Sequence, residues 1–163
     1  MLFKTKILKN TFENITFAVD LLKKNNVVGL PTETVYGLGG RADKDDVIKK
    51  IYNIKKRPYS NPLILHYRNK IAAMEDILVD QRTIELAKKF WPGALTIISK
   101  SKNNHISKIA TANLKTLAVR VPSNITIRKI LNQVSFPVAA PSANRYGKIS
   151  PTSANDVFEE LKG

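Results

Sequence analysis

The chain has 163 residues, 43% of them hydrophobic, which suits one compact domain spanning residues 1–163 that buries most of its apolar surface. It contains no cysteine, which excludes disulfides, thiolate nucleophiles and zinc–thiolate sites, so catalysis must use oxygen and nitrogen groups or a hard metal ion. Lys and Arg outnumber Asp and Glu by 27 to 13, and this net charge of +14 favours phosphate-rich partners, although a solvated, lysine-rich surface would give the same total.

No segment approaches the roughly 18 consecutive apolar residues that a membrane span needs. The N-terminal stretch MLFKTKILKN also lacks the long apolar core and the small-residue cleavage site of a secretory signal. We therefore expect a soluble, cytoplasmic protein with no membrane partner.

The first third of the chain predicts a helix, a strand and a second helix. Between Asn14 and Asn25, apolar residues recur at i, i+3, i+4 and i+7 behind an Asn that can cap the helix. Val27–Leu30 predicts a short buried strand, and a glycine-rich turn leads from it to Asp45 and Asp46, two acids that favour a helix N-terminus. The prolines of KKRPYSNP, residues 55–62, end this second helix.

The rest of the chain alternates between segments with the apolar pattern of strands and segments with the apolar spacing of helices. Strands are predicted at residues 63–65, 94–99, 116–121 and 137–140. Helical spacing covers residues 71–90, in one or two pieces, and residues 125–131. A last helix begins around SPTSANDVFEEL, where either Ser-Pro or Ser153 with Asp156 can open the helix. Strands that alternate with helices indicate an α/β domain with a central, mixed and twisted sheet.

Four polar clusters share one design, in which a short apolar strand runs into a turn that carries functional groups. Because ligands of α/β sheets bind where loops from separate strands meet, we expect these clusters to form one pocket. The clusters are Thr32-Glu33-Thr34 with Tyr36 and Gly37, Lys55 to Asn61 with His66, Thr116 to Arg120, and Ser142-Ala143-Asn144 with Ser150.

Two of the clusters carry fixed cations. In KKRPYSNP two prolines restrain Lys55, Lys56 and Arg57, which suits a polyphosphate, although the same residues could form the solvated last turn of a helix. Arg120 lies in the apolar strand LAVRV, where a buried guanidinium needs an anionic ligand or a carboxylate such as Glu33. The alternative for Arg120 is an edge strand with the side chain in water.

Other polar residues are open to a simpler interpretation. Small residues flank Ser142 and Asn144, so a ligand can lie against the backbone there, but isolated Ser and Asn are also common turn formers. A lone histidine such as His66 is usually a hydrogen-bonded core residue, and His105 lies in a polar segment typical of a surface. The sequence contains no P-loop, no dinucleotide fingerprint and no cluster typical of a Ser-His-Asp triad or a metal site.

Five stretches together resemble one protein family. PTETVYGLG, KKRPYSNPL, WPGALT, LAVRVP and APSANRYGKISPT occur in the order and approximate spacing of the Sua5/YrdC/YciO family, the L-threonylcarbamoyladenylate synthases. The resemblance covers roughly residues 17–161. It implies a YrdC-like α/β fold, in which helices surround a twisted, mostly mixed or antiparallel sheet with a basic concave face.

The resemblance also implies an activity. The family condenses L-threonine, bicarbonate or carbon dioxide, and ATP to threonylcarbamoyl-AMP and pyrophosphate, with Mg²⁺ accompanying the ATP and no organic cofactor. The product serves the formation of N6-threonylcarbamoyladenosine beside the anticodon of tRNA. The implied partners are therefore ATP, L-threonine, bicarbonate, the downstream tRNA threonylcarbamoyl-transfer proteins and, by contact, tRNA or other RNA.

The family pattern assigns roles to positions of this sequence. Lys55 and Arg57 correspond to the catalytic cations that hold the nucleotide phosphates, and we expect both side chains to face solvent, so that replacing either abolishes turnover without unfolding the protein. The implied ATP-binding residues are Lys55, Arg57, Asn61, Thr116, Ser142, Asn144 and Ser150. The implied threonine-binding residues are Thr32, His66, Arg120 and the backbone of Ala140, with Arg120 meeting the substrate carboxylate.

One departure and two competing interpretations accompany this resemblance. Family members usually continue with further strands where this sequence ends, at Gly163. A basic RNA-binding module without catalysis would also explain the charge, but aromatic residues, the usual partners of stacked bases, make up only 7% of the chain. A related carbamoyl-transfer module, of the kind fused in hydrogenase-maturation proteins, is the third interpretation.

Overall fold

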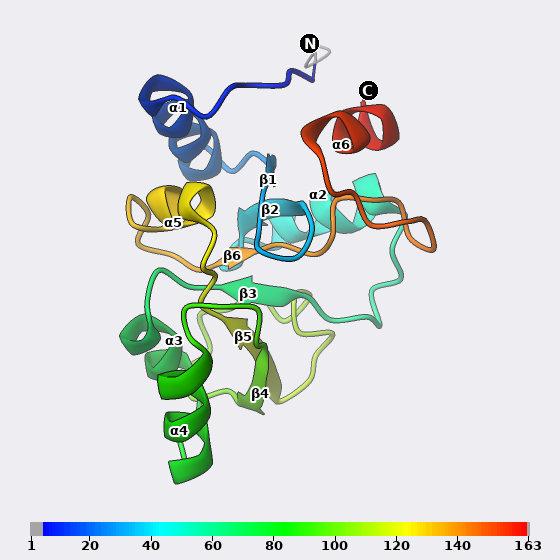
Figure 1. The fold of residues 1–163 in the computed structure, drawn as a ribbon. Coiled ribbons are helices and arrows are strands. Elements are labelled where there is room, and N and C mark those ends of the chain that lie inside the picture. The colour runs from blue at the N-terminus through cyan, green and yellow to red at the C-terminus, as the bar shows by residue number, and fades with distance from the viewer. Residues whose placement is uncertain (1–4, 163) are drawn as a thin grey trace.

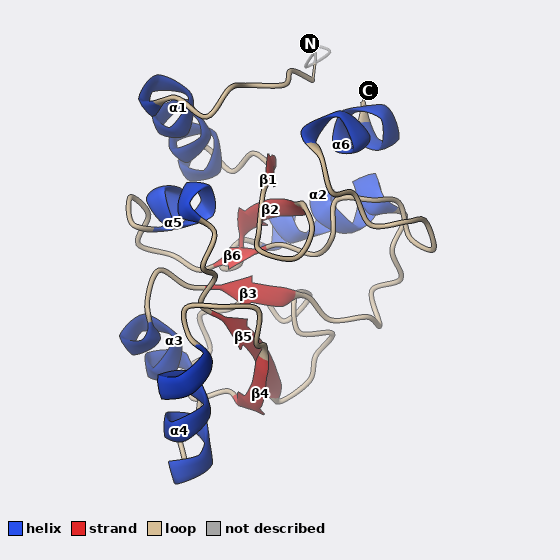
Figure 2. Ribbon diagram, viewed as in Figure 1, coloured by secondary structure: helices blue, strands red, loops and turns tan. Residues whose placement is uncertain are grey.

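The computed structural model of the protein describes residues 5–162. A six-stranded sheet crosses the middle of the molecule in the order β1-β2-β6-β3-β5-β4 (Figures 1 and 2). β3 and β5 run parallel, and all other neighbouring strands pair antiparallel, so the predicted mixed sheet is confirmed. None of the helices within residues 5–162 has the length and apolar character needed to cross a bilayer.

The strands are short and the helices flank them on both sides. The strands are β1 (Val28–Leu30), β2 (Gly37–Arg41), β3 (Ile64–His66), β4 (Ile97–Lys100), β5 (Thr116–Arg120) and β6 (Val138–Ala139). The helices are α1 (Phe12–Lys23), α2 (Asp45–Lys55), α3 (Lys70–Asp76), α4 (Gln81–Phe90), α5 (Ile125–Leu131) and α6 (Ala154–Leu161).

Two hydrophobic clusters cover opposite faces of the sheet. One contains the inner face of α2, and the other contains the facing sides of α1 and α5, which lie side by side (Figure 1). Val138 and Ala139 are consecutive in β6, so their side chains point to opposite faces, and they belong to different clusters. His66 is paired with Val138, which places His66 on the α1 and α5 face.

Helix ends follow their capping residues. The hydroxyl of Thr11 accepts a hydrogen bond from the Asn14 amide, so α1 begins at Phe12, earlier than predicted. The predicted helix at residues 125–131 is confirmed residue for residue, because the Asn124 side chain caps it. The reciprocal capping box of Ser153 and Asp156 at α6 is also confirmed.

The glycine-rich segment after β1 is a strand rather than the predicted turn. Glycine has a low strand propensity, but here it is required by close packing. A Cβ atom on Gly39 would lie 2.6 Å from Leu30 Cδ1, and one on Gly40 would lie 2.5 Å from Val47 Cγ1. The missing Cβ atoms of Gly39 and Gly40 therefore leave room for the Leu30 side chain of β1 and for α2.

Candidate functional site

A cavity of ≈ 250 Å³ lies where the carboxyl ends of the parallel strands β3 and β5 meet the loops around residues 32–37 and 140–142. Ligands of α/β proteins commonly bind at this position. Six residues that the family resemblance assigned to the site line the cavity: Thr32, Arg57, His66, Arg120, Ala140 and Ser142. The other lining residues are Thr34, Val35, Tyr36, Gly37, Pro62, Ile64 and Pro141.

The loop that begins at Thr32 is held by a compact turn. Thr32 Oγ1 accepts hydrogen bonds from the amides of Thr34 and Val35, both at 3.2 Å, and donates to the Val35 carbonyl at 2.6 Å. The amide of Tyr36 then donates to the carbonyl of Pro151 at 2.9 Å, which connects this loop to the C-terminal region. The Thr32 hydroxyl therefore organises one wall of the cavity.

Arg120 ends β5 and is held on several sides. Its Nε donates to Thr96 Oγ1 at 2.9 Å, and its Nη1 donates to Thr34 Oγ1 at 3.3 Å and lies 3.5 Å from Glu33 Oε1. The predicted pairing of Arg120 with Glu33 is therefore confirmed. Because β5 lies between β3 and β4, the edge-strand alternative is wrong.

His66 ends β3 beside Arg120, its register partner in β5. Only 2% of His66 is exposed, and neither ring nitrogen has a hydrogen-bond partner among residues 5–162. His66 is therefore buried, as the simpler interpretation has it, but it lacks the hydrogen bonds of a typical core histidine. Burial, and then the charge of Arg120, lower the pKa of His66 to about 4, so the imidazole is neutral at pH 7. A buried, unpartnered polar group on a cavity wall is suited to bind a polar ligand.

Lys55 is buried, which contradicts the prediction that it faces solvent. It ends α2 with 1% of its surface exposed, and its Nζ donates to the carbonyls of Ser142, at 2.5 Å, and Asn144. Burial, and then the nearby charge of Arg57, lower the pKa of Lys55 to about 8. The ammonium therefore holds the Ser-Ala-Asn loop, residues 142–144, through two of its backbone carbonyls.

Arg57 is half-buried and lines the cavity, so the prediction of a solvent-facing side chain is only partly right. Lys56, which follows the last residue of α2, has a left-handed conformation with φ of 50°. The Nε of Arg57 then donates to the carbonyl of Asn61 and its Nη2 to that of Pro62, both at 3.0 Å. The guanidinium is therefore held against its own loop at the edge of the cavity.

Besides Lys55 and Asn61, three predicted positions do not line the cavity and have other surroundings. Asn144 is buried, and its Nδ2 donates to the carbonyls of Arg145 and Lys148, both at 2.8 Å, while its Oδ1 has no partner among the described residues. Ser150 lies exposed in the loop that follows. Thr116 begins β5 and Arg120 ends it, so about 13 Å of strand separates them.

The Sua5_yciO_yrdC family model, described as telomere recombination, matches residues 20–163. This chain belongs to that family. The threonylcarbamoyl-AMP synthases of Bacillus subtilis and Pyrococcus abyssi are 45% and 41% identical to it over 151 and 154 residues, which is 91% of the chain in both cases. Those matches cover only 43% and 44% of the two relatives, so the chain spans less than half of their length.

Solved structures of the Sua5_yciO_yrdC family share this fold. The crystal structure of P. abyssi Sua5 complexed with L-threonine has a TM-score of 0.87 and 36% identity, and the match covers 95% of this chain and 45% of that one. Escherichia coli YciO has a TM-score of 0.81 at 21% identity, over 96% of this chain and 75% of that one, which supports the fold alone.

The family resemblance also pointed to Lys55, Asn61, Asn144, Thr116 and Ser150, and the structure groups them differently. Lys55 donates to the carbonyls of Ser142 and Asn144, and the Asn61 carbonyl accepts from Arg57. Thr116 and Ser150 lie outside the cavity lining. Their roles toward ATP stay predictions.

Sequence reasoning missed two hydroxyls that orient Arg120. Thr34 was noted only as part of the first polar cluster, and Thr96 was quoted only as the last residue of WPGALT. Both are hydrogen-bonded to the guanidinium. Thr96 lies 24 positions before Arg120, and only the antiparallel packing of this segment against β5 brings the two together.

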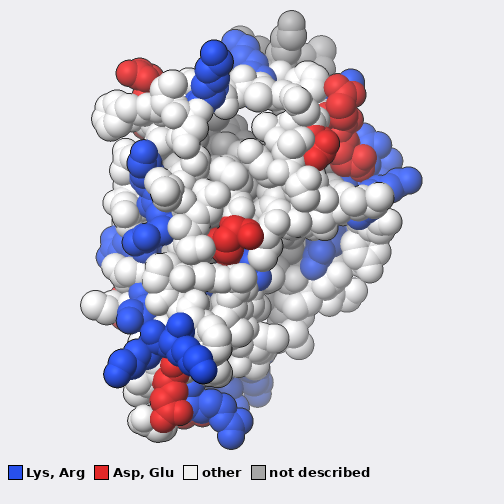
Figure 3. Space-filling model, viewed as in Figure 1, with Lys and Arg blue, Asp and Glu red and all other residues white. Residues whose placement is uncertain are grey.

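Charge is unevenly distributed over the surface. On the face shown in Figure 3, Lys and Arg gather along one side and around the lower end, where acidic residues also lie, and the centre is mostly uncharged. This face is therefore not uniformly basic. The charged groups of the cavity itself are Arg57 and Arg120, and Glu33 lies beside Arg120.

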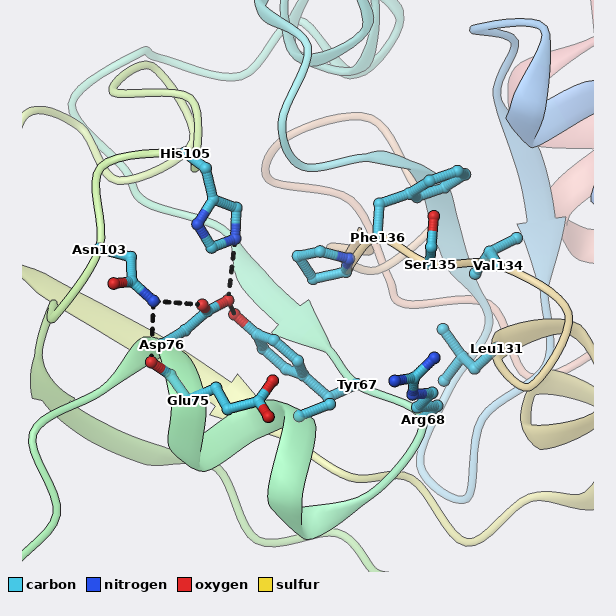
Figure 4. A pocket seen from close by; sticks show the side chains of 12 residues that line it. Tyr67, Arg68, Glu75, Asp76, Asn103, His105, Leu131, Val134, Ser135 and Phe136 are labelled. Atoms are coloured by element: carbon cyan, nitrogen blue, oxygen red, sulfur yellow. Dashed lines mark hydrogen bonds and ion pairs between the residues drawn. The ribbon is translucent and has the colours of Figure 1, made fainter.

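A second cavity of ≈ 240 Å³ lies between α3 and the loop after α5 (Figure 4). At its wall the buried carboxylate of Asp76 accepts from Tyr67 Oη at 2.7 Å and from Asn103 Nδ2 at 3.1 Å, and lies 3.2 Å from His105 Nε2. His105, expected to be plain surface, is thus paired although its side chain is 47% exposed. These groups satisfy one another, which indicates a structural network.

Proposed function

We propose that this chain is a nucleotidyltransferase that condenses L-threonine, bicarbonate or carbon dioxide, and ATP to threonylcarbamoyl-AMP and pyrophosphate. Family membership and the relatives named threonylcarbamoyl-AMP synthase support the proposal. The observation that carries it is the cavity in which Arg120, neutral His66 and the hydroxyls of Thr32 and Thr34 meet beside Arg57. A small amino acid with a hydroxyl group is complementary to these side chains.

The amino acid would bind at the ends of β3 and β5. Arg120 would donate to its carboxylate, because a guanidinium forms strong charge-assisted hydrogen bonds with carboxylates. His66, with both ring nitrogens unpartnered, would hydrogen-bond a neutral polar group such as the threonine hydroxyl. The backbone of Ala140 and the turn of Thr32 would close the same pocket.

The chemistry requires positioning more than a nucleophilic side chain. The threonine amine loses a proton and attacks the carbon of carbon dioxide or bicarbonate, and bicarbonate loses water in this step. An oxygen of the resulting carbamate attacks the α-phosphorus of ATP, and the bond to pyrophosphate breaks. Negative charge builds up on the phosphoryl oxygens, so Arg57 at the cavity edge would stabilise the transition state.

Lys55 would act differently from Arg57. Its ammonium already donates to two carbonyls of the Ser-Ala-Asn loop, so it would hold Ser142 and Asn144 in place for the nucleotide. Magnesium would arrive with ATP as part of the substrate, since this ion is commonly held by the phosphates together with water.

The product would be passed on, in the cytoplasm, to proteins that modify the adenosine beside the anticodon of tRNA. The net charge of +14 is compatible with direct RNA contact during this transfer. A purely RNA-binding module would not need the pocket formed by Thr32, His66 and Arg120.

Calorimetric titration of the 163-residue chain with L-threonine tests the proposal at its pocket. We expect saturable binding that Arg120→Ala and Thr32→Val each weaken, while Thr116→Val, at the other end of β5, leaves threonine binding unchanged. RNA binding that falls steeply with salt, in the absence of any threonine binding, would instead support the RNA-binding module.

A further inference from the structure

Arg120 is held at two of its three guanidinium nitrogens. Thr96 accepts from Nε, and Thr34 and Glu33 lie at Nη1, at 2.9, 3.3 and 3.5 Å. No partner for Nη2 lies within hydrogen-bond distance among residues 5–162, and the side chain lines the cavity. The contacts with Thr96, Thr34 and Glu33 thus leave one guanidinium nitrogen, Nη2, available to a ligand.

Of the three residues that hold Arg120, which are Thr34, Thr96 and Glu33, only Glu33 is charged, and it is itself held in place. Its Oε2 accepts from the backbone amides of Ser123, at 3.0 Å, and Asn124, at 3.4 Å, just before α5 begins. Its side chain is only 14% exposed, and that of Arg120 only 12%. Glu33 therefore connects the Thr32 loop, Arg120 and the start of α5.

We propose that Glu33 is a positioning residue that orients Arg120 so that Nη2 meets the carboxylate of the amino-acid substrate. This inference rests on the proposed function, because it assumes that a carboxylate binds at Arg120. Thr34 and Thr96 supply neutral hydrogen bonds, and Glu33 supplies the charge that keeps a largely buried guanidinium paired before the ligand binds.

Glu33 also has an electrostatic effect that weakens, rather than strengthens, the binding of a carboxylate. A negative charge beside Arg120 also repels an incoming carboxylate, so its removal would strengthen binding if Glu33 acted only as a counter-charge. We expect orientation to dominate, because the Glu33 carboxylate is fixed by two backbone amides and contacts Nη1, whereas Nη2 is the nitrogen left for the ligand. The sign of the effect of Glu33→Gln therefore separates the two roles.

The test compares wild type with Glu33→Gln, in which the amide oxygen can still accept from Ser123. We expect the dissociation constant for L-threonine to rise on the order of tenfold, which corresponds to the loss of one charged hydrogen bond. Affinity for ATP should stay within about twofold. L-Threoninol, which lacks the carboxylate, should bind wild type and Glu33→Gln with the same affinity. Glu85→Gln, an exposed substitution on α4, is the matched control and should change nothing.

Two results would overturn the inference. One is unchanged or tighter threonine binding by Glu33→Gln, and the other is an equal loss of affinity for threoninol. Arginine side-chain NMR of the ligand-free proteins tests, without threonine, whether Glu33 fixes Arg120. The guanidinium signals of Arg120 should show restricted rotation in wild type and averaging by rotation in Glu33→Gln. If wild type bound no threonine, the proposed function would fail, and the NMR comparison would still show whether Glu33 fixes Arg120.

Discussion

Replacing Lys55 with Ala should destabilise the fold, because this lysine is buried under the Ser-Ala-Asn loop. Three methylene groups leave the interior at about 0.8 kcal/mol each, or about 2.4 kcal/mol. Two hydrogen bonds from a charged donor are lost, at about 1.5–3 kcal/mol each. The variant also no longer buries an ammonium, and this relief amounts to at most about 3 kcal/mol for a pKa lowered from 10.5 to about 8. The net loss is about 2–5 kcal/mol.

The assay is urea denaturation at pH 7, with Lys49→Ala, an exposed substitution on α2, as control. Lys49→Ala should stay within about 0.5 kcal/mol of wild type. The pH dependence adds a second test. Because the folded pKa of Lys55, about 8, lies below its ordinary value of 10.5, the unfolded chain binds more protons between these pH values, and wild-type stability gains from this group as pH rises through the window. Lys55→Ala should lack that gain. A variant as stable as Lys49→Ala, with an unaltered pH profile, would refute the buried position of Lys55.

Three further predictions concern single side chains. Arg57→Ala should lower pyrophosphate release at least about 100-fold, because the guanidinium would act on ATP, and should destabilise the fold less than Lys55→Ala, because Arg57 is only half-buried; normal turnover would contradict this. The folded pKa of His66, about 4, lies below its ordinary 6.5, so its contribution to wild-type stability is lost as pH falls from 6.5 to 4, and His66→Gln should show a flatter profile in urea titrations; parallel profiles would argue against a buried neutral imidazole. Tyr67→Phe removes a hydrogen bond to buried Asp76 and should cost about 1–3 kcal/mol in unfolding free energy without changing threonine affinity; a change in that affinity would show that the network reaches the candidate site.

Local sequence signals predicted the elements that have caps and periodicity. The range of α5 follows from Asn124 and the apolar spacing that comes after it, and the capping box of Ser153 and Asp156 marks the start of α6. Strand β2 was missed because its glycines carry no strand signal. Their role depends on close approach to Leu30 and Val47, which arises only when β1 and α2 pack against β2.

The sequence predicted residues that line the candidate site, but not how deeply the individual side chains are buried. Charge suggested that Lys55 faces solvent, although the residue follows Ile48 by seven positions and Ile51 by four, which is the spacing of the buried face of α2. Helical spacing could therefore have indicated its burial. The unpartnered state of His66 could not be predicted, because it depends on how β3 and β5 meet around the cavity.

Pyrophosphate release from ATP and bicarbonate, measured with and without L-threonine on the 163-residue chain, is the direct test of the proposed activity. We expect release that requires both threonine and bicarbonate and that Arg120→Ala reduces through weaker threonine binding. Release that is independent of threonine, or no release from a folded chain that binds both ATP and threonine, would contradict the claim that this cavity catalyses formation of threonylcarbamoyl-AMP.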